Sequence, residues 1–239
     1  GIVVLSFLLA SPPEGFREMV MAGKQDVKEQ EAPQKPKTYV YNVNKSQMLR
    51  LPIFYFIVTS MLIGLACGNM IITQGSPMLQ LQFGMAVTAT AIVVGQLAIT
   101  NTIGRVAWGA FSDKIGKVNS LLLVHIIMVV LMLLLFMMNN QTIFIISLLG
   151  VTFCYGGYAC LVAPVTAELF GGEHISENYS VTYCVFGLSS MIGPVIISLI
   201  RESTGAYTLG FAAAAALAVA GVITTFLTMG MAKKVKKEV

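Results

Sequence analysis

The sequence predicts an all-α polytopic membrane protein, and three observations support this: the composition, the long apolar runs and the placement of the charges. Of the 239 residues, 56% are hydrophobic and 11% are charged, and the mean hydropathy is +0.80. A soluble domain carries about 25% charged residues. Most of the charges here fall in short segments between long apolar runs. This pattern is typical of a chain that crosses a membrane several times.

Six apolar runs are long enough to cross a bilayer. A hydrocarbon core about 30 Å thick requires ~20 residues of helix at 1.5 Å per residue. Backbone polar groups must bond to one another in lipid, so long runs without strict alternation are expected to be helices. Turn-forming or polar residues bound each run. The expected spans are residues 51–75, 85–107, 119–138, 143–165, 179–200 and 207–230.

The segments outside this bundle set its expected orientation. Residues 1–10, GIVVLSFLLA, are expected to be the end of a truncated helix, and residues 11–50 mix prolines with charges of both signs, which indicates a solvated linker. The six-helix bundle then covers residues 51–232, and residues 233–239 form a basic tail. The positive-inside rule places the linker and the tail in the cytoplasm. An even number of spans agrees with this, because it returns the chain to its starting side.

The chain shows no signature of an enzyme, a metal site or a cofactor. Its four cysteines lie in or close to apolar runs and form no CxxC pair, and a free cysteine behaves as a small hydrophobe. There is no HExxH sequence, nucleophile elbow or phosphate-binding loop. We therefore expect a protein that is not an enzyme, with no metal, no cofactor, no disulfide and no nucleic-acid partner.

A glycine-rich charged turn follows the second expected span. Its glycines permit a tight turn and close helix approach. Its aspartate can accept hydrogen bonds from a neighbouring helix N-terminus or pair with a basic group, and such contacts would hold one conformation and break in another. Glu168, at the end of the fourth span, is expected to join this charge network. The motif of this predicted conformational latch is Gly109-x-x-x-Asp113-Lys114-x-Gly116-Lys117.

This motif resembles the signature of the major facilitator superfamily, and four longer stretches resemble the second half of the oxalate/formate antiporter family in order and spacing. The resemblance implies a twelve-helix fold of two six-helix bundles that rock around a midplane site. This chain would then supply the end of helix 6, the central cytoplasmic loop and helices 7 to 12. The missing N-terminal six-helix half would be its partner, and the fragment alone would be inactive. The four stretches are GLACGNMIITQGSP (64–77), NTIGRVAWGAFSDKIGK (101–117), APVTAELFGGEHISENYS (163–180) and FGLSSMIGP (186–194).

Arg105 is the main substrate-binding candidate. It lies eight residues before Asp113, about 12 Å along a helix, and hence inside the membrane. A charge near the bilayer centre costs about 2.5–3.5 kcal/mol on insertion scales, so it should face a cavity or a partner. A guanidinium fork suits a carboxylate. By resemblance, Arg105 matches the helix-8 arginine that binds the substrate carboxylate in oxalate transporters. The alternative is a snorkelling or latch arginine that pairs with Asp113 or Glu168.

Glu177 marks a departure from the family pattern. By resemblance, a second cation is expected here, a helix-11 lysine just before an Asn-Tyr pair, but Glu177 precedes Asn178 and Tyr179 in this chain. One arginine suits a monocarboxylate better than a dianion such as oxalate. Glu177 could also carry a coupled proton. The alternative is an interfacial residue that the dipole at a helix N-terminus favours.

Several side chains inside the spans are weaker candidates. Tyr155 and Tyr158 in the fourth span could line the substrate cavity or simply pack. Gln74 and Gln96 could contact the ligand or join helices to one another.

Three residues of the fifth span are expected to allow close packing and the bending that rocking requires. They are Gly187, Gly193 and Pro194.

Together these features predict a secondary active transporter of small organic anions in the inner or plasma membrane. The candidate substrates are formate, lactate, pyruvate and an oxalate-type acid, and the coupling partner is a proton or a counter-anion. Two alternatives stay open. One is another carrier of the superfamily, of the efflux or sugar type, in which Arg105 would be structural. The other is a non-transporting membrane subunit.

Overall fold

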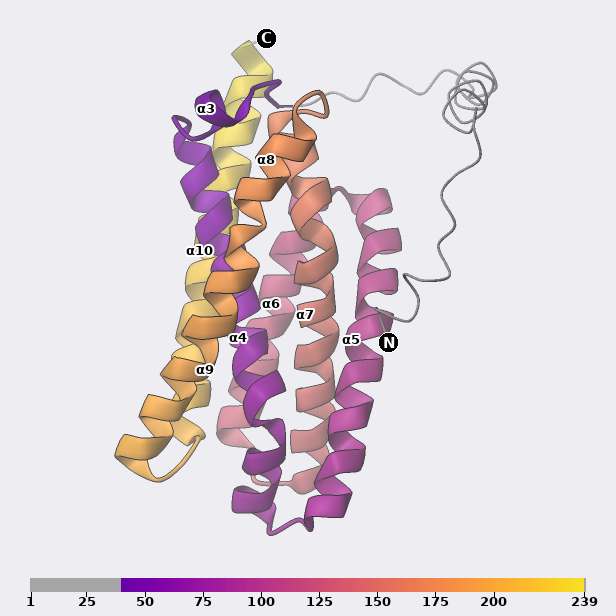
Figure 1. Cartoon of the computed structure of the whole chain (residues 1–239), viewed down its shortest axis with the longest axis vertical. Coiled ribbons are helices and arrows are strands. Elements are labelled where there is room, and N and C mark those ends of the chain that lie inside the picture. Colours follow the sequence, from indigo (N-terminus) through magenta and orange to yellow (C-terminus); the bar gives the residue numbers. More distant parts are fainter. Residues whose placement is uncertain (1–39, 239) are drawn as a thin grey trace, which may run out of the picture. The chain divides into compact units, whose positions relative to one another are not determined.

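The computed structural model describes residues 40–238, so the predicted helix end at residues 1–10 and most of the predicted linker lie outside the described residues. An extended segment leads into a one-turn helix and then into a bundle of long helices (Figure 1). The helices are α3 (Lys45–Met48), α4 (Pro52–Phe83), α5 (Val87–Ile115), α6 (Lys117–Met137), α7 (Gln141–Phe170), α8 (Ile175–Thr182), α9 (Cys184–Thr204) and α10 (Thr208–Glu238).

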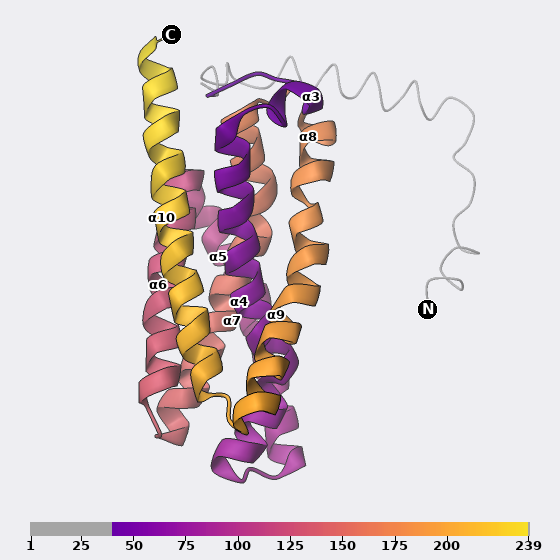
Figure 2. The same cartoon turned by 90° about the vertical axis from the view of Figure 1, so that its left-hand side faces the viewer.

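Within the described residues, six helices are long and apolar enough to cross a membrane when α8 and α9 are counted as one span. Consecutive spans run in opposite directions along the bundle (Figures 1 and 2). This confirms the prediction of an all-α, six-helix integral membrane protein. The turns that follow α5 and α7 lie at the end that also holds residues 40–50, and we call it the motif end. The loops at residues 84–86, 138–140 and 205–207 lie at the opposite end.

The first span is longer than the sequence predicted. The boundary expected at Gln74–Pro77 is wrong, because α4 continues through Pro77 to Phe83. It is capped by Gly84, whose φ of 62° glycine adopts readily. Proline is tolerated inside membrane helices where nearby polar side chains satisfy the freed backbone groups. Polar side chains bond to one another along this turn, where Gln80 Nε2 donates to Ser76 Oγ at 2.9 Å.

The last two spans also differ from the expected limits. The fifth begins at Ile175 rather than at residue 179, and its helix is interrupted at Tyr183. Just before the interruption, the hydroxyl of Thr182 donates to the carbonyl of Asn178 at 3.2 Å, a type of side-chain bond that often bends a helix. The sixth continues as α10 to Glu238, so residues 233–238 of the predicted tail extend this helix.

Glycines let the helices around the bundle centre approach closely. α4 and α7 are the most buried spans, α5 packs mainly on α7, and α9 packs mainly on α4. Gly104 lies against the backbone of α7, and Gly156 lies against the backbone of α5. Gly193 of α9 lies so close to α4 that a Cβ there would be 2.5 Å from the carbonyl oxygen of Ala66. Small residues at such crossings are the usual means of packing membrane helices.

The expectation of close packing therefore agrees with the surroundings of Gly193 but is wrong for Gly187. Gly187 is exposed, and a Cβ there would meet nothing within 4 Å among the residues that the structure describes. Pro194 follows Gly193 inside α9 and is half-buried, and the helix continues through it to Thr204.

Residues 40–44 are bonded to the bundle, in contrast to the solvated linker that the sequence predicted. The backbone amides of Val40, Tyr41 and Val43 donate to the last three carbonyls of α7, at 3.2, 2.8 and 3.1 Å. These carbonyls have no partner within their own helix. Asn178 Nδ2 on α8 also donates to the carbonyl of Val43 at 2.9 Å. The segment that precedes α4 thus holds the corner between α7 and α8.

Candidate functional site

Arg105 lies inside α5, ten residues before the helix ends at the motif end, which is about 15 Å along the axis. Its side chain is exposed, and Nε donates to Asn101 Oδ1 at 3.4 Å. Among residues 40–238 this is the one hydrogen bond of the guanidinium, and no carboxylate pairs with it. The predicted alternative of a pair with Asp113 or Glu168 is therefore not seen. Both Nη groups are available to bind an anion.

Neutral polar side chains of three other helices are connected to one another beside the contact of α7 with α5 at Arg105. Tyr155 of α7 packs its ring on Gly68 of α4, and the next residue, Gly156, lies against the backbone of α5 at Asn101 and Arg105. Asn69, one residue further along α4, donates from Nδ2 to Ser189 Oγ of α9 at 3.1 Å. We call Arg105, Asn101, Tyr155, Asn69 and Ser189 the Arg105 cluster.

Sequence reasoning missed three members of this cluster, Asn101, Asn69 and Ser189, and also Tyr183, which lies close to Tyr155. The pattern on the fifth span gives a signal that was available in advance. Small or polar residues recur there every three or four positions, which places them on one helical face. This face carries Ser176, Ser180, Tyr183, Gly187 and Ser190, and all five are exposed.

Two of the predicted substrate-binding residues lie elsewhere. Tyr158 is fully buried, with its ring centroid 4.8 Å from that of His125, and this burial favours the packing alternative over a role in a cavity wall. Gln96 lies nine residues before Arg105, which is about 180° around α5 at 100° per residue. It shares its face with the exposed Ile99 and Ile103 and points away from the cluster.

Gln74 joins helices at the opposite end of the bundle. Its Oε1 accepts a hydrogen bond from the Tyr207 hydroxyl at 3.0 Å, and its Nε2 donates to Ser198 Oγ at 3.4 Å. Burial raises the pKa of the Tyr207 phenol, although the positive charge of nearby Arg201 acts against it. The hydroxyl therefore keeps the proton that it donates. These contacts favour the helix-joining alternative for Gln74.

The structure does not bring Glu177 to Arg105. Glu177 is exposed in the first turn of α8. Tyr183, which lies near Tyr155, is six residues further along the span, about 9 Å at 1.5 Å per residue. A carboxylate in the first turn of a helix is stabilised by the helix dipole. This position fits the interfacial alternative better than a direct contact with a substrate at Arg105.

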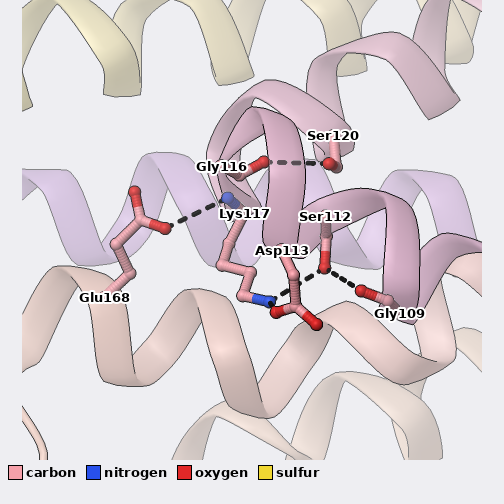
Figure 3. Close-up of polar contacts among 7 residues, drawn as sticks. All are labelled: Gly109, Ser112, Asp113, Gly116, Lys117, Ser120 and Glu168. Atoms are coloured by element: carbon pink, nitrogen blue, oxygen red, sulfur yellow. Dashed lines mark hydrogen bonds and ion pairs between the residues drawn. The ribbon is translucent and has the colours of Figure 1, made fainter. Parts of the chain in front are cut away.

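The turn between α5 and α6 gathers most of the predicted latch (Figure 3). Lys117 Nζ forms an ion pair with Asp113 and donates to Ser112 Oγ at 3.0 Å, while the Ser112 hydroxyl donates to the carbonyl of Gly109 at 2.7 Å. Gly116 has a φ of 93°, which favours glycine at the turn. Asp113 therefore pairs with a basic group, the second of the two roles considered for it.

Glu168 makes the helix-capping contact that the sequence had considered for Asp113. Its Oε2 accepts from the backbone N–H of Lys117 at 3.1 Å and so satisfies one of the free amides at the start of α6. Figure 3 shows this carboxylate reaching the turn from α7. Lys114 is exposed and takes no hydrogen bond or ion pair in the described part of the chain. A Cβ at Gly109 would meet nothing within 4 Å among residues 40–238, so close helix approach is not seen there.

These features define an integral membrane protein. It has an arginine well inside one span and a turn of glycines and charged residues between two spans. The chain belongs to the Major Facilitator Superfamily, whose family model matches residues 2–194 and 67–238. The match confirms the superfamily predicted from the sequence and the prediction that the chain is not an enzyme.

Several characterised and uncharacterised relatives share this similarity. The chain is 24% identical over 241 residues to the oxalate:formate antiporter of Oxalobacter formigenes, a match that covers 100% of this chain and 54% of the antiporter. It is 25% identical over 147 residues to an uncharacterized MFS-type transporter, YhjX, of Escherichia coli, covering 61% and 37% of the two chains. It is 29% identical over 131 residues to mouse monocarboxylate transporter 14, covering 53% and 25%. The chain thus spans at most about half the length of these relatives.

Proposed function

We propose that the chain forms the C-terminal half of a secondary active transporter for small organic anions, which works by alternating access. The observation that carries this proposal is the state of Arg105. It is a cation placed well inside a span, exposed, with one 3.4 Å hydrogen bond to a neutral amide among the described residues. A charge at such depth is costly unless it is paired, and a carboxylate that binds both Nη groups would pair it.

The number of cations favours a monocarboxylate. In residues 40–238, Arg105 is the one lysine or arginine that lies far from both ends of its span, since Lys114, Lys117, Arg201, Lys233 and Lys234 lie near helix ends. One positive charge balances one carboxylate such as formate, lactate or pyruvate. A dianion such as oxalate would need a second cation from helices outside this chain.

Similarity supports the same substrate class. The relative that matches the whole chain is named for oxalate and formate, and others are named as monocarboxylate transporters. We therefore propose a carrier of the oxalate/formate type. A proton or a counter-anion couples to transport in this proposal. Glu177, about 9 Å along its helix from Tyr183, does not bind the substrate at Arg105 directly.

The exposed faces of α5 and α9 are consistent with a cavity that six further helices would complete. These two spans are the least buried of the bundle. α5 carries Arg105 and Asn101, and α9 carries Ser190 of the exposed face described above. We propose that the motif end faces the cytoplasm, as the basic residues of the linker and of α10 indicate.

Uptake by the complete carrier that contains this chain tests the proposal. The purified carrier is reconstituted in liposomes and offered labelled formate, lactate, pyruvate, oxalate and an uncharged sugar, with and without a pH gradient. We expect saturable uptake of at least one monocarboxylate, competition among the monocarboxylates, and no uptake of the sugar. Uptake of the sugar, or of cationic drugs in preference to all acids, would contradict the proposal and support the efflux or sugar alternative.

A further inference from the structure

An apolar groove of about 320 Å³ lies on the outer side of α5, α6 and α7. At 100° per residue, Ala107 and Phe111 lie about 120° to 160° around α5 from Arg105, so the groove is separate from the Arg105 cluster. Phe111 is 41% exposed, which leaves the groove open to the bilayer. The residues that line it are Ala107, Trp108, Phe111, Leu123, Ile127 and Phe153.

Lys114 lies in line with this groove at the motif end. Ala107, Phe111 and Lys114 follow one another at intervals of four and three residues, which places them on one face of α5. Lys114 is exposed, and nothing in residues 40–238 bonds to its ammonium, whereas neighbouring Lys117 is paired with Asp113. The Lys114 ammonium at the motif end of the groove is therefore unpaired within residues 40–238.

The spacing between the charge and the groove matches a phospholipid. Seven residues separate Lys114 from Ala107, about 10 Å along the helix. The headgroup region adds about 5–8 Å to the hydrocarbon core on each side of a bilayer. A phosphate at Lys114 would thus bring the first methylenes of its acyl chains to the level of Ala107 and Trp108.

We propose that this groove binds one anionic phospholipid, with its phosphate at Lys114 and an acyl chain between α5 and α6. The apolar lining takes the chain because it holds only hydrophobic side chains, and the free ammonium selects a headgroup with a net negative charge. The site goes beyond the proposed transport function and does not depend on it.

The single tryptophan of the chain makes the groove directly observable. Trp108 is the one tryptophan among the 239 residues, and it lines the groove. The chain is placed in phosphatidylcholine vesicles, and quenching of its fluorescence is compared between brominated phosphatidylglycerol and brominated phosphatidylcholine at equal mole fractions. One lysine near a membrane surface is expected to give about a fivefold preference for the anionic lipid.

Three variants and one competitor complete this experiment. Lys114→Gln should bring the preference close to one, while Lys45→Gln, which alters an exposed lysine of α3 at the same end, should leave it unchanged. Ala107→Phe, which fills the groove, should reduce quenching by both lipids. Equal quenching by both lipids, or a preference that survives Lys114→Gln, would overturn the proposal. Loss of the preference with millimolar inorganic phosphate would also overturn it, since that would indicate a site for a free anion.

Discussion

Two charged regions of α5 lie only eight residues apart and differ in how their charges are satisfied. At the α5–α6 turn, Asp113 pairs with Lys117, and Glu168 accepts a hydrogen bond from the backbone of the same lysine at 3.1 Å. Arg105, inside the membrane, has one 3.4 Å hydrogen bond to Asn101. The chain itself supplies partners for Asp113, Lys117 and Glu168 at the turn, which indicates a structural or latching role for these three residues. It leaves Arg105 to a partner from elsewhere, and this contrast is the physical basis of the proposed anion site.

The largest expected effect comes from removing the guanidinium. In the complete carrier, Arg105→Gln should lower anion uptake by about 100-fold, because two charge-assisted hydrogen bonds at about 1.5 kcal/mol each are lost. Arg105→Lys should keep part of the activity, since it retains the charge but not the fork. Lys117→Gln is the comparison and should change uptake far less. Equal losses from Arg105→Gln and Lys117→Gln would erase the distinction between the two regions.

A matched pair of glycines tests the scaffold of the Arg105 cluster. Gly193→Ala should destabilise the bundle by about 1–3 kcal/mol, because the added methyl group meets the α4 carbonyl of Ala66 next to Asn69. Gly187→Ala, in the same helix, meets nothing within 4 Å among the described residues and should be neutral or slightly stabilising. Thermal unfolding in detergent measures both. Similar losses for the two variants would contradict the assignment of the effect to the close crossing of α9 with α4.

The cap on α6 gives a smaller effect. Glu168→Ala should lower the free energy of unfolding by about 1 kcal/mol, since it leaves the backbone amide of Lys117 without its acceptor. Chemical or thermal unfolding in detergent again provides the measurement. Full retention of stability would contradict this prediction. It would mean that water accepts the hydrogen bond of the Lys117 amide as well as the Glu168 carboxylate does.

The smallest effect is expected at Asp113. The side chain of Asp113 is 73% exposed, so its pair with Lys117 should contribute less than about 1 kcal/mol and should weaken with added salt. Asp113→Asn should therefore hardly change the unfolding temperature. If it nevertheless alters transport rates, the residue acts on the balance between conformations and not on the stability of one of them.

The sequence predicted the number of spans well because hydrocarbon thickness fixes a minimum apolar length. It failed at Gln74–Pro77, where rules for breaking helices in water do not apply to a packed membrane helix. Arg105 and the turn were identified because charge inside or between apolar runs is conspicuous. Asn69 and Ser189 were not, since they are neutral, 120 residues apart and brought together only by the crossing of α4 and α9.

Errors at the candidate site came mainly from the direction of side chains. The sequence left open whether Tyr158 lines a cavity or packs, and the close approach of α4 at Gly64 together with the neighbouring His125 buries it completely. That placement depends on tertiary packing and has no signature in a single sequence. Gln96 was different, because its nine-residue separation from Arg105 already implies opposite faces of one helix.

The backbone bonds from residues 40–43 to the last turn of α7 carry a mechanical implication. A tilt of α7 would pull on the entry to α4, and the amide of Asn178 would transmit the same pull to α8. The three helices α4, α7 and α8 would then move together. Movement of this half as a rigid block, with little sliding between its helices, is what such a tether favours.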